Sequence, residues 1–416
     1  MKLTKKQYKN IVIASLSLIV WNLAYLCSTF YVQFQDYYGI TDGQIGKIIS
    51  FLGLATIIGY AFGGLLADRF APKKMLIASC ILSGVLGICM TITKSYAALC
   101  AIHFGLGLSG SLISWDAFLK FMRFTGTDEQ QGKIFGSFEV IYAVIGVIMG
   151  YGVVASMNSI LEKYDFSVVI LVHAGLIILA AVLMFFFLND PDYSRVGGDD
   201  AGNKFSFKLI GEALKQPVTW LNALIVLGLS IAGAATIYVA PLLQNVFGMS
   251  VTLVLAMNLF NSRVTRIALT PLGGAIIDRM GKSSTMVIIS ALVAIVCFVV
   301  MALIPQVASY GMLFLIIWTI GAIPVTMSRP ALYTPVGEAA VPAAITGTVM
   351  GIVSSIGYCQ DLWFYNLCGR WLDKYGNAAY NYIWYFAAGA LVMVMVCSAT
   401  FQIYLNRKHK RELENA

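Results

Sequence analysis

Long apolar stretches, each about the length needed to cross a lipid bilayer, recur along nearly the whole chain. A transmembrane helix needs about 20 mostly apolar residues to span ~30 Å of hydrocarbon. The alternating pattern that would indicate barrel strands is absent from these stretches, so they are predicted to be helices. The pattern predicts an all-α membrane protein with twelve spans, at residues 11–32, 46–66, 75–93, 97–119, 134–156, 167–188, 218–240, 251–277, 284–304, 309–334, 344–367 and 380–405.

Composition and charge agree with a multi-pass protein of the cytoplasmic (inner) membrane. Hydrophobic residues make up 59% of the chain and charged residues 12%. Twenty Lys and Arg residues fall at the N-terminus, in the even-numbered connections and in the tail, against five in the odd-numbered connections. The positive-inside rule therefore predicts that both termini lie in the cytoplasm. The net charge of +8 reflects this topology and does not indicate a nucleic-acid surface.

The two halves of the sequence resemble each other. The segment "GGLLADRF" at 63–70 returns as "GGAIIDRM" at 273–280, and "GKIFG" at 132–136 matches "GTVMG" at 347–351. An ordered series of matches at nearly constant offset indicates internal duplication, and duplicated six-span halves are a known transporter plan. We expect an N-terminal six-helix bundle at 1–190, a polar cytoplasmic linker at 191–216, a C-terminal six-helix bundle at 217–405 and a basic tail at 406–416.

The repeated G-x-x-x-D-R segment resembles the loop signature of the major facilitator superfamily, in which it follows spans 2 and 8. The resemblance implies a secondary transporter that works by alternating access, without a cofactor, around a central cavity lined by helices 1, 4, 7 and 10 and their neighbours. Carboxylates at a helix end can pair with arginines or cap a neighbouring helix. The residues expected to form such a conformational latch are Gly64, Asp68, Arg69, Asp278 and Arg279.

Two arginines lie near the centre of the eighth predicted span. Arg266 precedes Asp278 at the cytoplasmic edge by 12 residues, which is ~18 Å along a helix. Arg263 lies about 60° away around an ideal helix, so both can face one cavity. An arginine at this depth costs at least ~2.5 kcal/mol unless it meets water, a counter-charge or substrate. Two hypotheses for the partner of these arginines stay open, a carboxylate of the substrate and an internal salt bridge, since a guanidinium suits either.

The segment "NLFNSRVTR" at 258–266 resembles helix 8 of oxalate and formate type antiporters, which carry a substrate-binding arginine there. Other polar or aromatic side chains of the spans complete the candidate substrate site, although aromatic stripes in spans are more often packing or interface anchors. These further candidates are Asn22, Tyr25, Trp115, Asn261 and Tyr358.

Four charged residues within or near spans are candidates for gating or proton coupling. Arg329 on the tenth span can meet Asp116 or Glu139 from the first half and close the cytoplasmic mouth. Asp116 can instead pair with Lys120 at i+4 on its own helix. Asp361, late in the eleventh span, is expected near the outer mouth, where gating and simple solvation are both open. A protonatable carboxylate in a cavity can also couple transport to protons.

These features favour a monomeric secondary transporter for a small organic anion, with protons or a counter-anion as coupling partners. A proton-coupled exporter or importer of neutral or amphipathic molecules is the alternative within the class, and a transporter-like membrane sensor is the alternative outside it. Enzyme motifs such as H-E-x-x-H and G-x-S-x-G are absent, as is a P-loop. The three histidines do not cluster, so no metal site is predicted.

Overall fold

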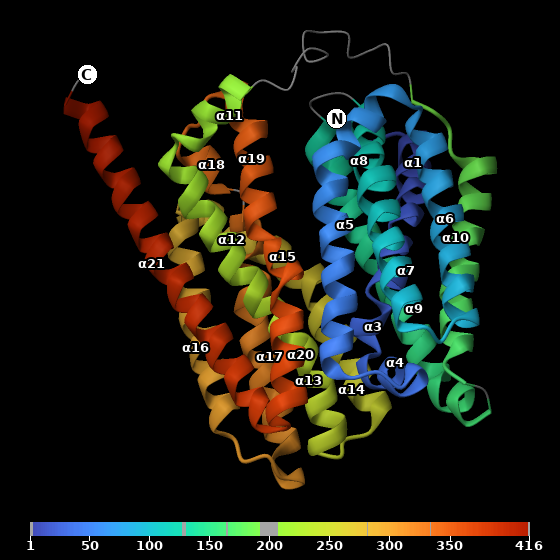
Figure 1. Ribbon diagram of the computed structural model, residues 1–416. Helices are drawn as coiled ribbons and strands as arrows, with labels where there is room; N and C mark the ends of the chain where they lie inside the picture. The colour runs from blue at the N-terminus through green and yellow to red at the C-terminus, as the bar shows by residue number, and fades with distance from the viewer. Residues whose placement is uncertain are drawn as a thin grey trace. The chain divides into compact units, whose positions relative to one another are not determined.

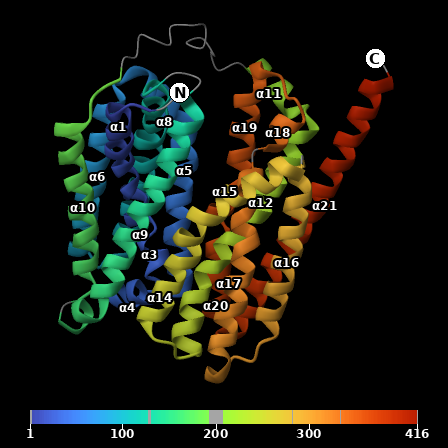
Figure 2. The same ribbon diagram turned by 180° about the vertical axis from the view of Figure 1, so that it is seen from behind.

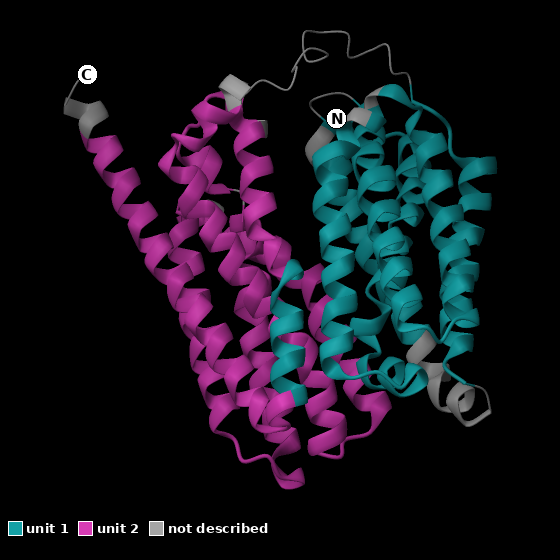
Figure 3. Ribbon diagram, in the orientation of Figure 1, with its two compact units in different colours: residues 1–202, 361–373 teal, residues 203–360, 374–416 magenta. Residues whose placement is uncertain are grey.

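The computed structural model describes residues 3–126, 130–163, 165–191, 207–280, 282–332 and 334–414. Every regular element in these ranges is helical, as Figures 1 and 2 show from two sides. The chain divides into two compact units, coloured in Figure 3. Unit 1 contains Met1–Gly202 and Asp361–Asp373, and unit 2 contains Asn203–Gln360 and Lys374–Ala416.

Unit 1 is built from long helices with recognisable start signals. Thr41 Oγ1 accepts a hydrogen bond from the backbone N–H of Gln44, and Gln44 Oε1 accepts one from the backbone N–H of Thr41. This capping box satisfies N–H groups that have no partner within the helix. The elements are α1 (Lys5–Ser15), η1 (Leu16–Ile19), α2 (Val20–Ala24), α3 (Leu26–Thr29), α4 (Tyr31–Tyr38), α5 (Asp42–Arg69), α6 (Pro72–Ile92), α7 (Tyr96–Leu108), η2 (Ser109–Trp115), α8 (Asp116–Phe124), α9 (Gln131–Lys163), α10 (Ser167–Phe187) and all but the end of α20 (Phe364–Tyr375). The short helix η11 (Cys359–Leu362), which leads into α20, is divided between the two units.

Unit 2 contains the remaining helices, several of which are interrupted. Its elements are α11 (Phe207–Leu214), α12 (Pro217–Ala235), η6 (Thr236–Tyr238), α13 (Val239–Pro241), η7 (Leu242–Val246), α14 (Val251–Leu259), η8 (Phe260–Val264), α15 (Thr265–Met280), α16 (Ser283–Leu303), η9 (Ala308–Tyr310), α17 (Gly311–Met327), η10 (Arg329–Leu332), α18 (Thr334–Glu338), α19 (Ala343–Gly357) and α21 (Ala378–Glu414). The last helix runs through the predicted boundary between the twelfth span and the tail.

Nine helical runs among the described residues are long and apolar enough to cross a bilayer. They coincide with nine of the twelve predicted spans. The other three predicted spans, 11–32, 251–277 and 344–367, are also helical but are each divided into shorter pieces. Broken helices of this kind are tolerated in a membrane only where the irregular backbone is buried in protein or lines a cavity.

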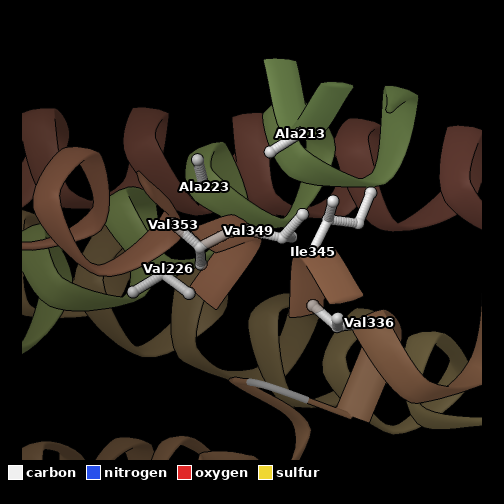
Figure 4. Close-up of a cluster of buried hydrophobic side chains, with 7 residues drawn as sticks. All are labelled: Ala213, Ala223, Val226, Val336, Ile345, Val349 and Val353. Atoms are coloured by element: carbon white, nitrogen blue, oxygen red, sulfur yellow. The ribbon is translucent and has the colours of Figure 1, made fainter. Parts of the chain in front are cut away.

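The end of the predicted linker belongs to the core of unit 2. Ala213 of α11 is fully buried in a cluster with residues of α12, α18 and α19, drawn in Figure 4. The cluster consists of small and β-branched side chains, which let these helices approach closely: Ala213, Ala223, Val226, Val336, Ile345, Val349 and Val353. The part of the linker near Gly198 lies outside the described residues.

The duplication seen in the sequence returns as a repeated packing contact. Gly63 of α5 leaves no room for a Cβ against Asp116 of α8, and the carbonyl of Leu112 lies 3.2 Å from that position. A Cβ on Gly273 of α15, its partner in the repeat, would collide with the backbone carbonyl of Met327 in α17. In both halves the second helix therefore packs tightly on the fourth through the first glycine of the repeated segment.

Candidate functional site

A cavity of ≈220 Å³ lies inside unit 2, between α12, the stretch from α14 to α15, α16 and α17. It contains two charged residues, Arg266 and Arg329, which the sequence assigned to substrate binding and to gating. The other polar lining residues are Thr236, Asn258, Asn261, Ser262 and Thr326. The cavity therefore brings two guanidinium groups and several hydroxyl and amide groups around one small volume.

The polar wall of the cavity is built on an irregular helix. Phe260–Val264 forms the π-helical turn η8 between α14 and α15. Ser262 Oγ donates to the carbonyl of Asn258 at 2.7 Å, and Thr265 Oγ1 donates to the carbonyl of Asn261 at 2.6 Å. Bonds from Ser and Thr to the preceding turn bend helices, and π-helical turns occur often at functional sites.

The two arginines of this helix have different positions. Arg266 is half-buried and lines the cavity, whereas Arg263 is half-buried but is not a lining residue. A π turn holds more residues than an α turn, so the angle between them departs from the ideal value used in the sequence prediction. Asn261, at 6% exposure, lines the cavity as well; its Nδ2 donates to Thr319 Oγ1 at 3.2 Å.

Arg329 reaches the cavity because the tenth span breaks before it. Pro324 lies inside α17, where its missing N–H weakens the helix. The α-helix ends at Met327, and Arg329 begins the short helix η10. Arg329 is exposed and lines the cavity together with Thr326 of the preceding turn.

The apolar side of the cavity is formed by α16 and the middle of α17. All four lining residues of α16 are weakly polar or apolar: Ala294, Cys297, Phe298 and Met301. On α17, Trp318 lines the cavity at 4% exposure. Gly321 brings the two helices together, because a Cβ there would lie only 2.9 Å from the Cβ of Cys297. Sequence reasoning missed Trp318 and Thr326, because both look like ordinary members of an apolar stretch.

The four remaining substrate candidates, Asn22, Tyr25, Trp115 and Tyr358, are not lining residues of this cavity. Asn22 and Trp115 belong to unit 1, where Asn22 Nδ2 lies 3.8 Å from Met149 Sδ and the Trp115 ring stacks on Phe118 at 6.3 Å between centroids. Tyr358 belongs to unit 2 and packs against the hydrophobic cluster of Figure 4. Their contribution to substrate binding stays a prediction.

Tyr25 and Asp361 meet within unit 1. Tyr25 Oη donates to Asp361 Oδ2 at 3.2 Å. Asp361 approaches α5, since a Cβ at Gly53 would lie 2.7 Å from the Asp361 Cβ. About two helical turns earlier in α5, a Cβ at Gly46 would collide with the backbone carbonyl of Tyr365. The chain around Asp361 and α20 therefore packs backbone to backbone on α5.

Asp373 completes this contact at the start of α5. Its Oδ2 accepts hydrogen bonds from the backbone N–H of Gly43 at 3.0 Å and from Thr41 Oγ1 at 2.9 Å. A carboxylate is favourable at a helix N-terminus, where backbone N–H groups and the helix dipole attract negative charge. The partners are separated by more than 300 residues, and no sequence motif predicts this hydrogen bond.

The predicted cytoplasmic gate and latch are described only in part. Asp116 is half-buried and Glu139 is exposed in unit 1, whereas Arg329 is in unit 2, so their pairing stays a prediction. Lys120 Nζ donates to the carbonyl of Ala67 at 2.7 Å, which anchors α8 to α5.

Of the latch residues, Arg69 and Arg279 are exposed in the last turns of α5 and α15. A Cβ at Gly64 would meet no atom within 4 Å, so this glycine is not needed for close packing within the described residues. The side chains of Asp68 and Asp278 lie outside the part of the chain that the structure describes. The latch therefore stays a prediction.

Known proteins resemble the chain along most of its length. The sequence profile of the Major Facilitator Superfamily matches residues 12–359. The inner membrane protein YqcE of Escherichia coli (strain K12) is 28% identical over 91% of this chain and 90% of its own. The multidrug resistance protein MdtG of Salmonella heidelberg (strain SL476) is 33% identical, but over only 33% of each chain. A crystal structure of the nucleoside transporter NupG superposes with a TM-score of 0.73 at 14% identity, covering 96% of this chain and 99% of that one.

Proposed function

This chain belongs to the Major Facilitator Superfamily, and we propose that it is a secondary transporter that moves a small organic anion across the membrane by alternating access. Arg266 is the main contact for the anionic group in this proposal. Arg329 is the second cation, because it lines the same cavity and Arg263 does not. Asn261 adds an amide to the same wall.

The observation that carries the proposal is the presence of Arg266 in the wall of a cavity within a membrane-spanning unit. Charged side chains at membrane depth are costly and usually mark a substrate or ion pathway. A guanidinium matches the two oxygens of a carboxylate with two parallel hydrogen bonds. A small organic anion therefore fits this site better than a neutral sugar does.

The test is a thermal-shift screen of the purified full chain against carboxylates, sugar acids, phosphates and neutral sugars. A ligand that binds only the folded protein raises the melting temperature in proportion to its affinity and concentration. Organic anions are expected to stabilise the protein, and neutral sugars are not. The Arg266→Gln variant, argued in the Discussion, decides whether the stabilisation arises in this cavity.

A neutral or amphipathic substrate is the second candidate. Part of the chain resembles MdtG, whose name describes multidrug resistance, and one side of the cavity is apolar. In that case lipophilic compounds without a negative charge would stabilise the protein as strongly as organic anions. Replacement of Arg266 by Gln would then leave the affinity of the best ligand unchanged.

Both termini are proposed to lie in the cytoplasm, in accordance with the twenty-to-five distribution of positive charges. Tags at the N-terminus, at Gly198 and at the C-terminus should be labelled by a membrane-impermeant reagent only after the cells are permeabilised. A tag at Gly198 that reacts in intact cells would contradict the proposed arrangement of two halves around a cytoplasmic linker.

Asp361 is proposed to take up the proton that accompanies the anion. Asp361 lies within a span and is hydrogen-bonded to Tyr25. It is a functional candidate because a carboxylate is energetically costly to place within a membrane. With Asp361→Asn, binding of the best anion should lose its dependence on pH, while binding itself persists. Asp190→Asn, an exposed position outside the helices, is the matched control and should keep the wild-type pH profile. Equal pH profiles for Asp361→Asn and wild type would remove Asp361 from coupling.

A further inference from the structure

The cavity of unit 2 is divided into a polar and an apolar side by the helices that build it. The stretch from α14 to α15 contributes only polar lining residues, Asn258, Asn261, Ser262 and Arg266. The lining residues of α16 are all weakly polar or apolar. From α17 to η10 the character of the lining changes, from Trp318 in α17 to Thr326 near its end and Arg329 at the start of η10. A ligand that fills the cavity must therefore carry its charge at one end and an apolar body at the other.

The volume of the cavity limits the size of that body. A cavity of ≈220 Å³ is smaller than the ~300 to 1,000 Å³ of pockets for drug-sized ligands. One six-membered ring with a short acidic arm fits into such a volume.

Two buried polar atoms in the wall call for a hydroxyl group on the ligand. Asn261 Oδ1 and Trp318 Nε1 are both buried and have no hydrogen-bond partner among the described residues. Asn261 and Trp318 are themselves 6% and 4% exposed. A buried polar atom that lacks a partner is costly. One atom accepts and the other donates, so hydroxyl groups, which do both, satisfy either one.

We propose that the ligand of this cavity is a carboxylate with a single apolar, preferably aromatic, ring that carries a hydroxyl group. This inference rests on the proposed anion transport and makes it more specific. Arg266 and Arg329 hold the carboxylate, the ring lies against Phe298 and Met301, and the hydroxyl meets Asn261 or Trp318. A sugar acid of the same size would leave several hydroxyl groups facing α16 without partners, which is unfavourable. Inorganic phosphate or sulfate would leave the apolar side unused.

The experiment compares five probes on the purified full chain by thermal shift. They are 4-hydroxyphenylacetate, phenylacetate, acetate, glucuronate and the neutral 4-hydroxybenzyl alcohol. We expect 4-hydroxyphenylacetate to give half-maximal stabilisation at a concentration at least tenfold lower than acetate or glucuronate. Phenylacetate should be weaker than its hydroxylated counterpart by about 2- to 10-fold, the range of one net hydrogen bond.

Three variants test whether the preference for a hydroxylated aryl acid arises in this cavity. Trp318→Phe keeps a ring but removes the N–H, so it should reduce the advantage of 4-hydroxyphenylacetate over phenylacetate. Ala294→Leu fills the apolar side and should weaken both aryl probes at least tenfold. Val293→Leu, at an exposed position of the same helix, is the matched control and should bind like wild type. Acetate binding in each variant shows that the protein remains folded.

Different results separate this inference from the function on which it rests. If glucuronate or acetate stabilises as well as 4-hydroxyphenylacetate, and Arg266→Gln abolishes that effect, anion transport stands and the ring-bearing ligand is wrong. If Ala294→Leu leaves aryl binding unchanged, the ring does not bind here and the inference is overturned. Equal stabilisation by 4-hydroxybenzyl alcohol and by the acid would contradict the proposed function itself.

Discussion

Replacement of Arg266 by glutamine should weaken binding of the best organic anion by about tenfold to a hundredfold while the protein stays folded. A hydrogen bond to a charged group contributes roughly 1.5 to 3 kcal/mol, and each ~1.4 kcal/mol changes affinity tenfold. Arg266 lies in the cavity wall and is only half-buried, so its loss removes a ligand contact without opening a large void. Anion-induced stabilisation in the variant and the wild type measures the change.

Three further variants locate the second cation. Arg266→Lys should recover only part of the affinity, because an ammonium group lacks the planar fork of a guanidinium. Arg329→Gln should weaken the same anion, since Arg329 lines the same cavity. Arg263→Gln should have a smaller effect, because Arg263 is not in the cavity wall. Arg407→Gln, on an exposed part of α21, is the control for net charge and should change nothing.

The internal salt-bridge reading of Arg266 predicts a different pair of results. Loss of one partner of a buried ion pair leaves the other charge uncompensated and costs about 3 to 5 kcal/mol of stability. The melting temperature without ligand would then fall strongly, and the affinity for anions would not change selectively. A folded Arg266→Gln protein with unchanged anion affinity would remove Arg266 from the site and favour the neutral substrate.

The general fold was predictable because it follows from the constraints that a lipid bilayer places on the chain. Apolar length and the absence of alternation predicted an all-α membrane protein, and the repeated glycine and aspartate segment predicted the superfamily; both are confirmed. Positions of helix breaks were not predicted. The π-helical turn at Phe260–Val264 coincides with hydroxyl groups that bond the preceding carbonyls, and an apolar stretch with scattered Ser and Thr does not show which of them do so.

Residues of the site were predictable only where the side chain is energetically costly to place within a membrane. Arg266 stood out because an arginine at membrane depth requires a reason, and it does line the cavity. Arg263 stood out for the same reason, but its direction depended on an ideal helix that the π turn alters. Trp318 carried no such signal, because a buried tryptophan suits an apolar stretch. Asp373 was missed because its bond joins segments far apart in sequence.

Substitution of Gly46 by alanine should open the contact between α5 and α20. A Cβ at Gly46 would collide with the carbonyl of Tyr365 and lie 2.9 Å from the Cα of Asn366. These are backbone atoms, so no side chain can turn away. Overpacking of this kind costs about 1 to 3 kcal/mol, which shifts a two-state equilibrium by about 5- to 150-fold. Alternating access requires that contacts on each side of the membrane form in one state and break in the other.

Native cysteines report whether the contact opens. Cys27 and Cys368 are fully buried in unit 1, and Cys368 lies on α20 itself. In Gly46→Ala both should react with an impermeant maleimide at least fivefold faster than in wild type, measured by mass spectrometry of the labelled peptides. Gly175→Ala in α10, where a Cβ meets no atom within 4 Å, is the control and should leave both thiols protected.

A third thiol distinguishes opening from unfolding. Cys80 of α6 is also fully buried in unit 1, and its Sγ lies 3.9 Å from the carbonyl of Ser17 in η1. If α5 and α20 separate as a gate, Cys80 stays protected while Cys368 reacts. Equal reactivity of Cys80 and Cys368 would mean that Gly46→Ala merely destabilises unit 1, and protection of all three thiols would mean that α5 and α20 remain together in every accessible state. Either result would contradict a gating role for the helix pair, because a gate must part where the backbones touch and must leave the rest of its unit intact.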